Sequence, residues 1–311
     1  MSLKQAISAF LLLLGFLFGW KPAEMHAQLE INSPTTWTTD QEFTQSVEVS
    51  APLTISGDLE IGFQYADLTG DSIGDLYFSI EEGGEIIIEP GSSLLFTRAG
   101  AVVGTPEHHW RGLILNASNT QISGNITVKY AVYGIWIAGS GNSIYNMSID
   151  STNAVRIEST ANNTLLKYMS ISNVITGDAG LNINADNTTI DYLRISDIAE
   201  TALDIDATVD STFITNMEIN NAQLGIDNRG YLVMDNVLVN NATTNGIINR
   251  GILGAENLSI TNSTLSGIQT LENSVTLLTL SEFTDNGSAG IEIGSSSSTV
   301  IVNSSNIFDN D

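Results

Sequence analysis

The sequence predicts an all-β protein, a right-handed parallel β-helix solenoid with rungs of about 22 residues. Three observations support this prediction: a repeat of nearly constant period, alternation of apolar and polar residues within each repeat, and a polar residue at a fixed corner. The repeats begin at intervals of 20 to 26 residues. A small residue opens each of them: Gly134, Ala154, Gly180, Ala202, Gly225, Gly246, Gly267 and Gly290.

Alternation within the repeats predicts strands, because successive side chains of a strand point to opposite faces. One apolar column is expected to point inward: Ile135, Val155, Leu181, Leu203, Ile226, Ile247, Ile268 and Ile291. The residue after each of these is expected to point outward: Trp136, Arg156, Asn182, Asp204, Asp227, Ile248, Gln269 and Glu292. Hairpins would reverse the strand direction and would not keep such columns in step. A coil that advances one rung per repeat keeps them, with strands paired in parallel at roughly 4.8 Å.

A column of corner residues supports the same architecture. It lies two residues after an apolar pair and consists of Ser151, Asn173, Asp197, Asn221, Asn241, Asn262 and Asp285. Asn and Asp tolerate the left-handed backbone conformation that a sharp corner between strands requires. Stacked Asn side chains are also expected to hydrogen-bond to one another along the axis of the coil.

These features resemble the right-handed parallel β-helix proteins of the pectate-lyase-like superfamily. The resemblance rests on the GIxI repeats, on MSI-type strands with Asn corners, and on the segment Ile86–Phe96 followed by His109–Leu115. It covers the chain from about Pro52 to the end. The resemblance implies a fold and no particular activity, because the superfamily contains lyases, hydrolases, epimerases and non-catalytic surface proteins.

Residues 1–27 are predicted to be a signal peptide, with an uncleaved anchor as the alternative. Lys4 supplies a positive charge, residues 9–20 form an apolar run, and Ala27 precedes the expected cleavage site. Residues 28–62 are expected to form an N-terminal cap or first rungs, and residues 63–311 the parallel β-helix. The chain contains no cysteine, so its core must hold it together without disulfides. We therefore expect a secreted, periplasmic or cell-surface protein.

The composition is strongly acidic. The formal net charge is −25, and removal of residues 1–27 would take away Lys4, Lys21 and Glu24 and leave −26. Such a charge argues against nucleic acid and anionic membranes as partners. It suits a solvated acidic surface or the binding of multivalent cations.

One loop, Ala66–Leu76, is a candidate calcium site. It contains the sequence DLTGDSIGD, with oxygen-bearing side chains at Asp67, Thr69, Asp71 and Asp75. This spacing is similar to the DxDxDGxxD loops of extracellular proteins, and calcium prefers several hard oxygen ligands from one short loop. The match is degenerate, because Thr69 replaces the usual Asp or Asn and Ser72 replaces the usual Gly. A polar insertion between rungs is the alternative.

Two neighbouring repeats share the triplet Asn-Arg-Gly, at residues 228–230 and 249–251. Strand parity places Asn228 and Asn249 inward, as a small buried amide ladder, and places Arg229 and Arg250 outward one rung apart. Three candidate substrate-binding residues are expected on the same outward face: Asp204, Asp206 and Asp227. The aspartates can pair with the arginines on a solvated surface, or the arginines can hold an anionic sugar.

In lyases of the superfamily a basic residue removes a proton, while acidic side chains bind a calcium ion. The resemblance therefore implies Arg229 or Arg250 as a catalytic base, with the three aspartates around calcium. The motifs of the polygalacturonases and alginate epimerases are missing from the sequence. Trp136, near Tyr130 and Tyr133, is a further candidate for substrate binding, because exposed aromatic rings stack on sugars. The same rings can equally cover a loop.

These observations favour an exported, non-catalytic scaffold for surface interaction or carbohydrate binding. The first alternative is a polysaccharide lyase or glycoside hydrolase that acts on an acidic polysaccharide. The second alternative is a calcium-stabilised, adhesin-like fragment.

Overall fold

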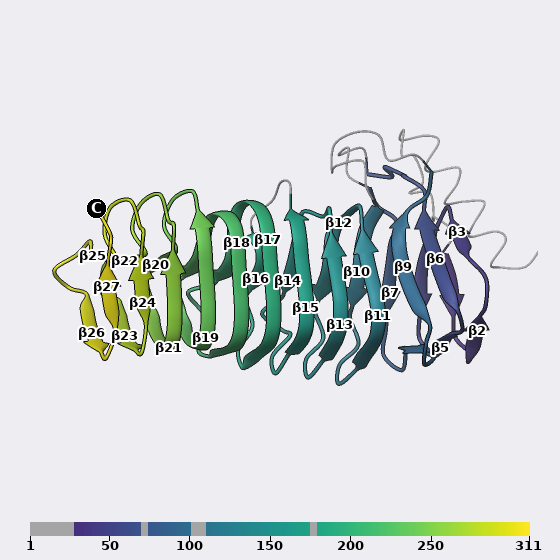
Figure 1. Cartoon of the computed structure of the whole chain (residues 1–311). Helices are drawn as coiled ribbons and strands as arrows, with labels where there is room; N and C mark the ends of the chain where they lie inside the picture. The colour runs from purple at the N-terminus through teal and green to yellow at the C-terminus, as the bar shows by residue number, and fades with distance from the viewer. Residues whose placement is uncertain (1–27, 70–73, 101–109, 175–178) are drawn as a thin grey trace, which may run out of the picture.

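The computed structural model describes residues 28–69, 74–100, 110–174 and 179–311. The predicted signal peptide, residues 1–27, lies outside them. The described residues wind into one elongated coil, with the N-terminal and C-terminal rungs at opposite ends (Figure 1). They form strands and connecting loops, and none of them belongs to a helix that could cross a membrane.

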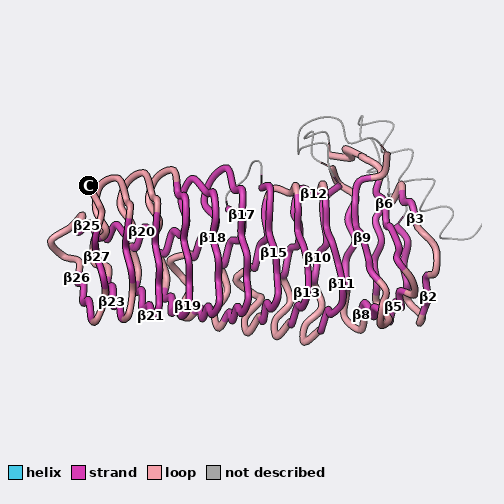
Figure 2. Tube along the Cα trace, in the orientation of Figure 1, coloured by secondary structure: helices cyan, strands magenta, loops and turns pink. Residues whose placement is uncertain are grey.

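Each rung has three sides, which we name face A, face B and face C in chain order. Strands stack side by side along the coil, with short loops between them (Figure 2). Face A contains β1 (Gln28–Ile31), β4 (Ser46–Val49), β7 (Tyr77–Ile80), β10 (Trp110–Leu115), β12 (Ala131–Ile137), β14 (Ala154–Ile157), β16 (Ala179–Ile183), β20 (Ile247–Asn249), β22 (Ile268–Thr270) and β25 (Ile291–Ile293). Face B contains β2 (Thr35–Trp37), β5 (Pro52–Ile55), β8 (Glu85–Ile88), β23 (Val275–Thr279) and β26 (Thr299–Asn303). Face C contains β3 (Gln41–Phe43), β6 (Asp58–Phe63), β9 (Ser93–Arg98), β24 (Glu282–Thr284) and β27 (Asn306–Phe308).

The remaining strands bend around corners and so belong to more than one face. Five of them run from face B into face C: β11 (Gln121–Lys129), β13 (Ser143–Asp150), β15 (Leu165–Val174), β19 (Tyr231–Ala242) and β21 (Ile252–Thr261). Two longer strands, β17 (Thr188–Ile205) and β18 (Thr212–Asn228), continue through face C onto face A.

Every pairing among the described strands is parallel and joins a strand to its copy one rung away, as in β17 with β18. The predicted columns are confirmed. Leu203 pairs with Ile226, which pairs with Ile247, while Asp204 pairs with Asp227 on the outward side. The repeat therefore has the predicted meaning: residues one period apart are neighbours in space.

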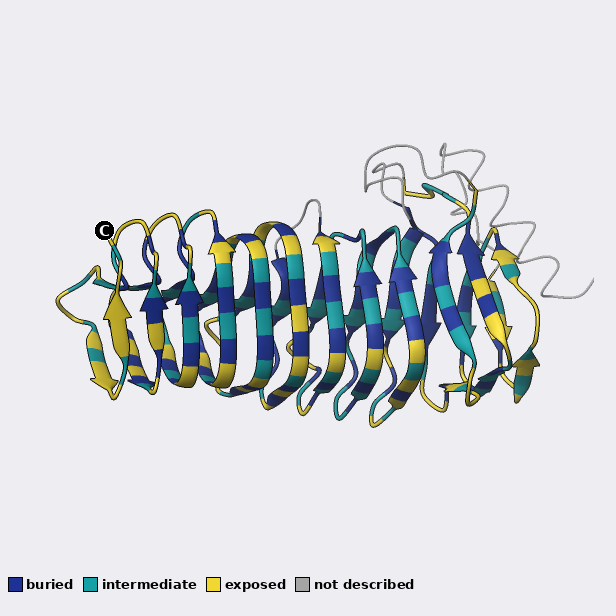
Figure 3. Cartoon of the chain, in the orientation of Figure 1, coloured by how far each residue is buried: buried dark blue, intermediate teal, exposed yellow. Residues whose placement is uncertain are grey.

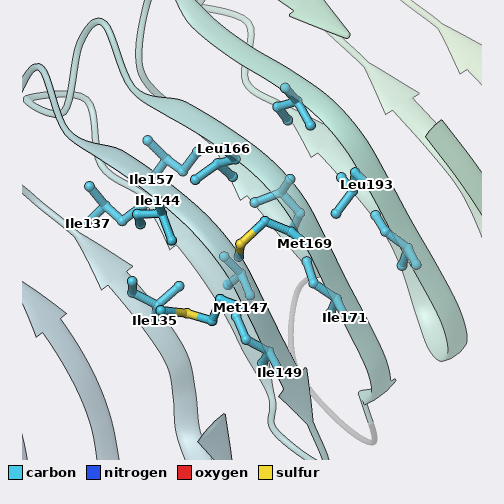
Figure 4. Packing of buried hydrophobic residues seen from close by; sticks show 14 of the residues in the cluster. Ile135, Ile137, Ile144, Met147, Ile149, Ile157, Leu166, Met169, Ile171 and Leu193 are labelled. Carbon is cyan, nitrogen blue, oxygen red and sulfur yellow. The ribbon is translucent and has the colours of Figure 1, made fainter. Parts of the chain in front are cut away.

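The core is a continuous apolar cluster along the axis of the coil. Buried residues recur on the strands of successive rungs (Figure 3). In the middle rungs Ile135, Ile149 and Met147 from different faces point into the same interior (Figure 4). Towards the N-terminus the filling becomes aromatic: Trp110 stacks on Phe63 with ring centroids 4.8 Å apart and lies 6.1 Å from Phe96. Burial of this apolar surface is the main source of stability.

The predicted corner column has the left-handed backbone conformation that we expected. Its residues have φ between 54° and 58°, from Ser151 to Asp285. Corner amides also bond between rungs, since Asn241 donates to Asn221 and Asn221 donates to Asp197, with N–O distances of 3.3 and 2.9 Å.

A second left-handed column, which the sequence analysis missed, turns the chain from face B to face C. It consists of Asn146, Tyr168, Tyr192, Asn216, Asn236, Asn257, Leu280 and Ser304. Residues of this column directly precede the apolar pair that leads to the first corner column, as Asn216 precedes Met217 and Ile219. Its four Asn residues were therefore a usable sequence signal. The two tyrosines and the leucine obscured it.

Candidate functional site

The predicted Asp and Arg residues meet on the outward side of face A, where β17, β18 and β20 end. Asp204 and Asp227 are register neighbours, and the position after Asp227 in the same column is Ile248. Arg229 and Arg250 follow directly after β18 and β20. The structure therefore brings together both arginines and two of the three aspartates.

Each arginine reaches back one rung to a carboxylate. Arg229 donates from one terminal nitrogen to both oxygens of Asp204, at 2.7 and 2.6 Å, and its Nε lies 3.9 Å from Asp227. Arg250 pairs with Asp227. The result is an alternating series of charges, Asp204–Arg229–Asp227–Arg250, in which each guanidinium is already neutralised by a neighbour.

The pKa values of these groups have separate causes. The hydrogen bond with Asp204 raises the pKa of Arg229, so this guanidinium stays protonated and cannot act as a general base. Burial raises the pKa of Asp227, although Arg250 opposes the shift. Hydrogen bonds from the backbone and hydroxyl of Thr208 lower the pKa of Asp206. Asp206 thus accepts hydrogen bonds within its own turn, and Arg229 acts on it only as a nearby charge.

Beneath this surface lies the predicted amide ladder. Asn228 and Asn249 are both fully buried, and Asn228 donates to the Asn249 side-chain oxygen at 2.8 Å. Asn249 in turn donates to the Thr276 hydroxyl at 2.8 Å. The ladder fixes the chain at the end of β18 and β20 and so positions the two arginines that follow it.

Trp136 does not join this group. It stands in the same outward column as Asp204 but three rungs earlier, which is roughly 14 Å along the axis. Its ring lies 5.1 Å from Tyr133 in an edge-on arrangement, and the guanidinium of Arg156 lies over it at 5.8 Å. Trp136 is half-buried and partly covered by these neighbours.

In the loop that was predicted to bind calcium, Asp75 is buried and serves as a hydrogen-bond acceptor. It accepts the backbone N–H groups of Leu68 and Thr69 at 2.6 and 3.0 Å, and it pairs with Arg111 at 3.3 Å. Asp71 lies outside the described residues, within which no group of three or more His, Cys, Asp or Glu residues could hold a metal ion. Calcium binding by Asp67, Thr69, Asp71 and Asp75 stays a prediction.

Two further surface features were not predicted. A shallow groove of about 570 Å³ follows the corner between faces C and A, lined by Asn173, Asp197, Ile198 and Asn221 among others. At the corner between faces B and C, Tyr168 and Tyr192 stack on each other with centroids 5.0 Å apart, and both are about half exposed.

Comparison with solved structures places the coil among known proteins. Pectate lyase Pel9A superposes with a TM-score of 0.60 at 11% identity, over 89% of this chain and 79% of the lyase. The alginate lyase from Paenibacillus sp. str. FPU-7 gives 0.51 at 12% identity, over 88% of this chain and 99% of that one. The fold is a pectate-lyase-like right-handed parallel β-helix.

A third β-helix of this kind, the periplasmic alginate epimerase AlgG, matches with a TM-score of 0.52 at 12% identity, over 93% of this chain and 81% of the epimerase. No protein-family model matches the sequence, and no curated protein matches it. At identities of 11–12% the likeness establishes the fold alone.

Proposed function

We propose that the protein is an exported β-helix scaffold that binds a polysaccharide or cell-surface glycan without cleaving it. The fold is shared with a pectate lyase, an alginate lyase and an alginate epimerase. Long strands stacked at a constant spacing offer a straight, rigid surface on which an extended polymer can lie. The apolar run before Gln28 supports export.

The observation that supports a non-catalytic role is the pairing of Arg229 with Asp204. A lyase needs a base near the sugar, but this guanidinium donates to both oxygens of a carboxylate, and its pKa is raised. Arg250 donates to one oxygen of Asp227. Each guanidinium is therefore protonated and already has a carboxylate partner, which argues against a role as the base.

The test is incubation of the purified protein with polygalacturonate and alginate, with and without calcium, while absorbance from unsaturated sugar ends is followed. In parallel, binding to a panel of soluble polysaccharides is measured by affinity electrophoresis. We expect retarded migration with at least one polysaccharide and no rise in absorbance. A rise in absorbance would refute the non-catalytic role, and failure to bind any glycan would refute the scaffold.

A lyase or glycosidase is the second candidate, and one observation favours it. Asp204 and Asp227 lie side by side on an outward face, and burial raises the pKa of Asp227, as is frequent for acids in active sites. If this candidate is right, Asp227→Asn abolishes any turnover, whereas Glu282→Gln on face C leaves it unchanged.

A further inference from the structure

The exposed apolar side chains of the regular rungs gather on one side of the coil. Among described residues 110–280, the large exposed apolar side chains on face B and its corner with face C are Tyr168, Tyr192, Phe213, Tyr231, Ile252, Val275, Leu277 and Leu280. The same residue range has one more, Leu265, which lies between faces C and A. A solvated solenoid needs no such concentration, and exposed apolar patches of this kind mark binding surfaces.

The strand register arranges the face B members of this set in two neighbouring columns. Tyr231 pairs with Ile252 and Ile252 with Val275, so their side chains stand one rung apart on the same side. Phe213 occupies the same outward column as Val233, Gly254 and Leu277. With the stacked tyrosines, aromatic rings occur on four successive rungs, at Tyr168, Tyr192, Phe213 and Tyr231. We call this surface the aromatic flank.

The two stacked tyrosines occupy backbone positions that disfavour them. Their φ angles are 56° and 57°, in the left-handed region, and the equivalent corner residues before and after them are Asn146 and Asn216. Asn tolerates this conformation well, whereas a bulky side chain there is an outlier. Asn216 also accepts a hydrogen bond from Asn236 at 2.7 Å, an interaction between rungs that tyrosine rings forgo. The tyrosines gain their mutual stacking, and the Lys167 ammonium lies 5.1 Å from the centroid of the Tyr168 ring, but Asn fits the backbone at both corners without strain. Two half-exposed rings at strained, neighbouring corners therefore point to a role beyond folding.

A polar column runs along the aromatic flank. It contains Asp191, Thr215, Asp235 and Glu256 in register, so a carboxylate or hydroxyl group stands on each of four successive rungs. Lys167 is the one basic residue on the described strands of face B, and Asp191 already holds it at 2.7 Å. The flank thus combines apolar rings with hydrogen-bond acceptors and has no unpaired positive charge within the described residues.

We propose that the aromatic flank binds an uncharged polysaccharide along the axis of the coil. The apolar faces of pyranose rings pack on the aromatic side chains, and sugar hydroxyl groups donate to the exposed carboxylates of Asp235 and Glu256. A polyuronate is excluded, because its carboxylates would face this column without a compensating cation. The inference rests on the proposed glycan-binding function and adds the surface and the chemical class of ligand.

The test compares the wild-type chain with the double variant Tyr168→Asn/Tyr192→Asn. Asn suits the left-handed backbone, so this variant is expected to fold with an unchanged or higher Tm. Leu238→Ala, on face C, is the matched control for loss of an outward apolar group. The probes are hydroxyethylcellulose, xyloglucan, laminarin and galactomannan as uncharged chains, with polygalacturonate and alginate as anionic ones. Affinity is measured by isothermal titration calorimetry, and sedimentation velocity gives the oligomeric state.

We expect the wild type to bind at least one uncharged chain and neither anionic one. The double variant should bind roughly tenfold more weakly or worse, which is the effect of losing one good packing contact, while Leu238→Ala binds normally. Binding that the tyrosine variant leaves intact, or a preference for polyuronate, would overturn the aromatic flank but leave the glycan-binding function standing. A dimer that the variant dissociates would assign the flank to self-association. No binding to any probe would refute the proposed function itself.

Discussion

At the scale of the residue, the left-handed corners are the most demanding positions of the coil. Asn221 has φ of 56°, and its amide donates to Asp197 at 2.9 Å. Asn satisfies both requirements, because its short side chain tolerates the backbone and supplies a donor. The corner column is therefore rich in Asn for reasons of backbone conformation and of bonding between rungs.

This argument predicts the outcome of two substitutions at Asn221. Both Gly and Val remove the hydrogen bond to Asp197, but only Val adds a β-branched side chain at a positive φ. We expect Asn221→Val to lose about 1–3 kcal/mol more than Asn221→Gly in free energy of unfolding. Urea denaturation followed by circular dichroism measures the difference, and equal stabilities would show that the corner is not under conformational strain.

The two aspartates beside Arg229 predict opposite responses to pH. Burial raises the pKa of Asp227, so its contribution to stability is present at low pH and is lost as pH rises through the folded pKa. Hydrogen bonds from Thr208 lower the pKa of Asp206, so its contribution is present at neutral pH and is lost as pH falls through the folded pKa.

At pH 7 we therefore expect Asp227→Asn to have the same or a higher Tm than the wild type, and Asp206→Asn to have a lower one. Both differences should shrink as the pH falls below about 4, where the carboxyl groups become protonated. Differential scanning calorimetry across this range is the measurement. A large loss of Tm in Asp227→Asn at pH 7 would mean that the ion pair with Arg250 outweighs burial.

At the scale of the element, two glycines within strands have different reasons to be glycine. Gly112 in β10 has φ of 131°, and an added Cβ would lie 1.9 Å from the carbonyl oxygen of Tyr133 on the next rung. Gly254 in β21 has open space around it, with no atom within 4 Å of an added Cβ. Close packing between rungs requires the first glycine and does not require the second.

We expect Gly112→Ala to cost about 2 kcal/mol or more, because both the backbone conformation and the contact are lost. Gly254→Thr should be neutral or should stabilise the chain by up to about 1 kcal/mol, since β-branched residues suit strands. Thermal unfolding of the two variants tests the pair, and similar losses in both would contradict the difference in packing.

The strands and their register were predictable, because each of the three faces recurs once per rung and all three therefore follow the same repeat length. The inward residues Leu203, Ile226 and Ile247 could be assigned to one column from their spacing alone. The corner from face B to face C was missed for a chemical reason. Tyr168 and Tyr192 occupy positions where most other repeats have Asn. Because a repeated position is recognised in a sequence by similar residues, these two tyrosines hid the column.

The candidate site was predictable in part. Parity placed Asp204, Asp227, Arg229 and Arg250 on one face, and the structure agrees. Pairing of the arginines with neighbouring aspartates was one of the two expectations, and the contact of Arg229 with Asp204 at 2.6 Å agrees with it. Parity does not determine which way a long side chain bends, so the choice of aspartate by each arginine could not be derived. Asp206 occupies the position equivalent to Arg229 one rung earlier, but it bonds to Thr208 in its own turn. The repeat length of a sequence predicts which residues share a face, but it does not predict side-chain torsions or local turns.

At the scale of the whole molecule, the formal charge of −25 works against compaction, because acidic columns stack like charges on successive rungs. Asp235 and Glu256 are one such pair of register neighbours. Raising NaCl from about 10 mM to about 1 M shortens the Debye length from roughly 30 Å to roughly 3 Å. We therefore expect Tm to rise with salt.

Glu256→Gln provides the control for this prediction. The variant removes one of two facing carboxylates, so its Tm should exceed that of the wild type in low salt, and the gain should disappear in high salt. Differential scanning fluorimetry is sufficient to follow both. A Tm that is independent of salt in both proteins would show that the acidic surface is neutralised by other means.

The second and third rungs are joined by an unusually long connection. Val47 pairs with Phe78 although 31 residues separate them, whereas Gln28 and Ser46 are 18 residues apart. The next strands, β5 and β8, pair in regular register regardless. The strands on either side of this connection, β6 and β7, thus keep the register of the coil. Because the register tolerates a connection of this length, a foreign peptide inserted between β6 and β7 should leave the rungs intact, which makes this junction a natural graft point for display.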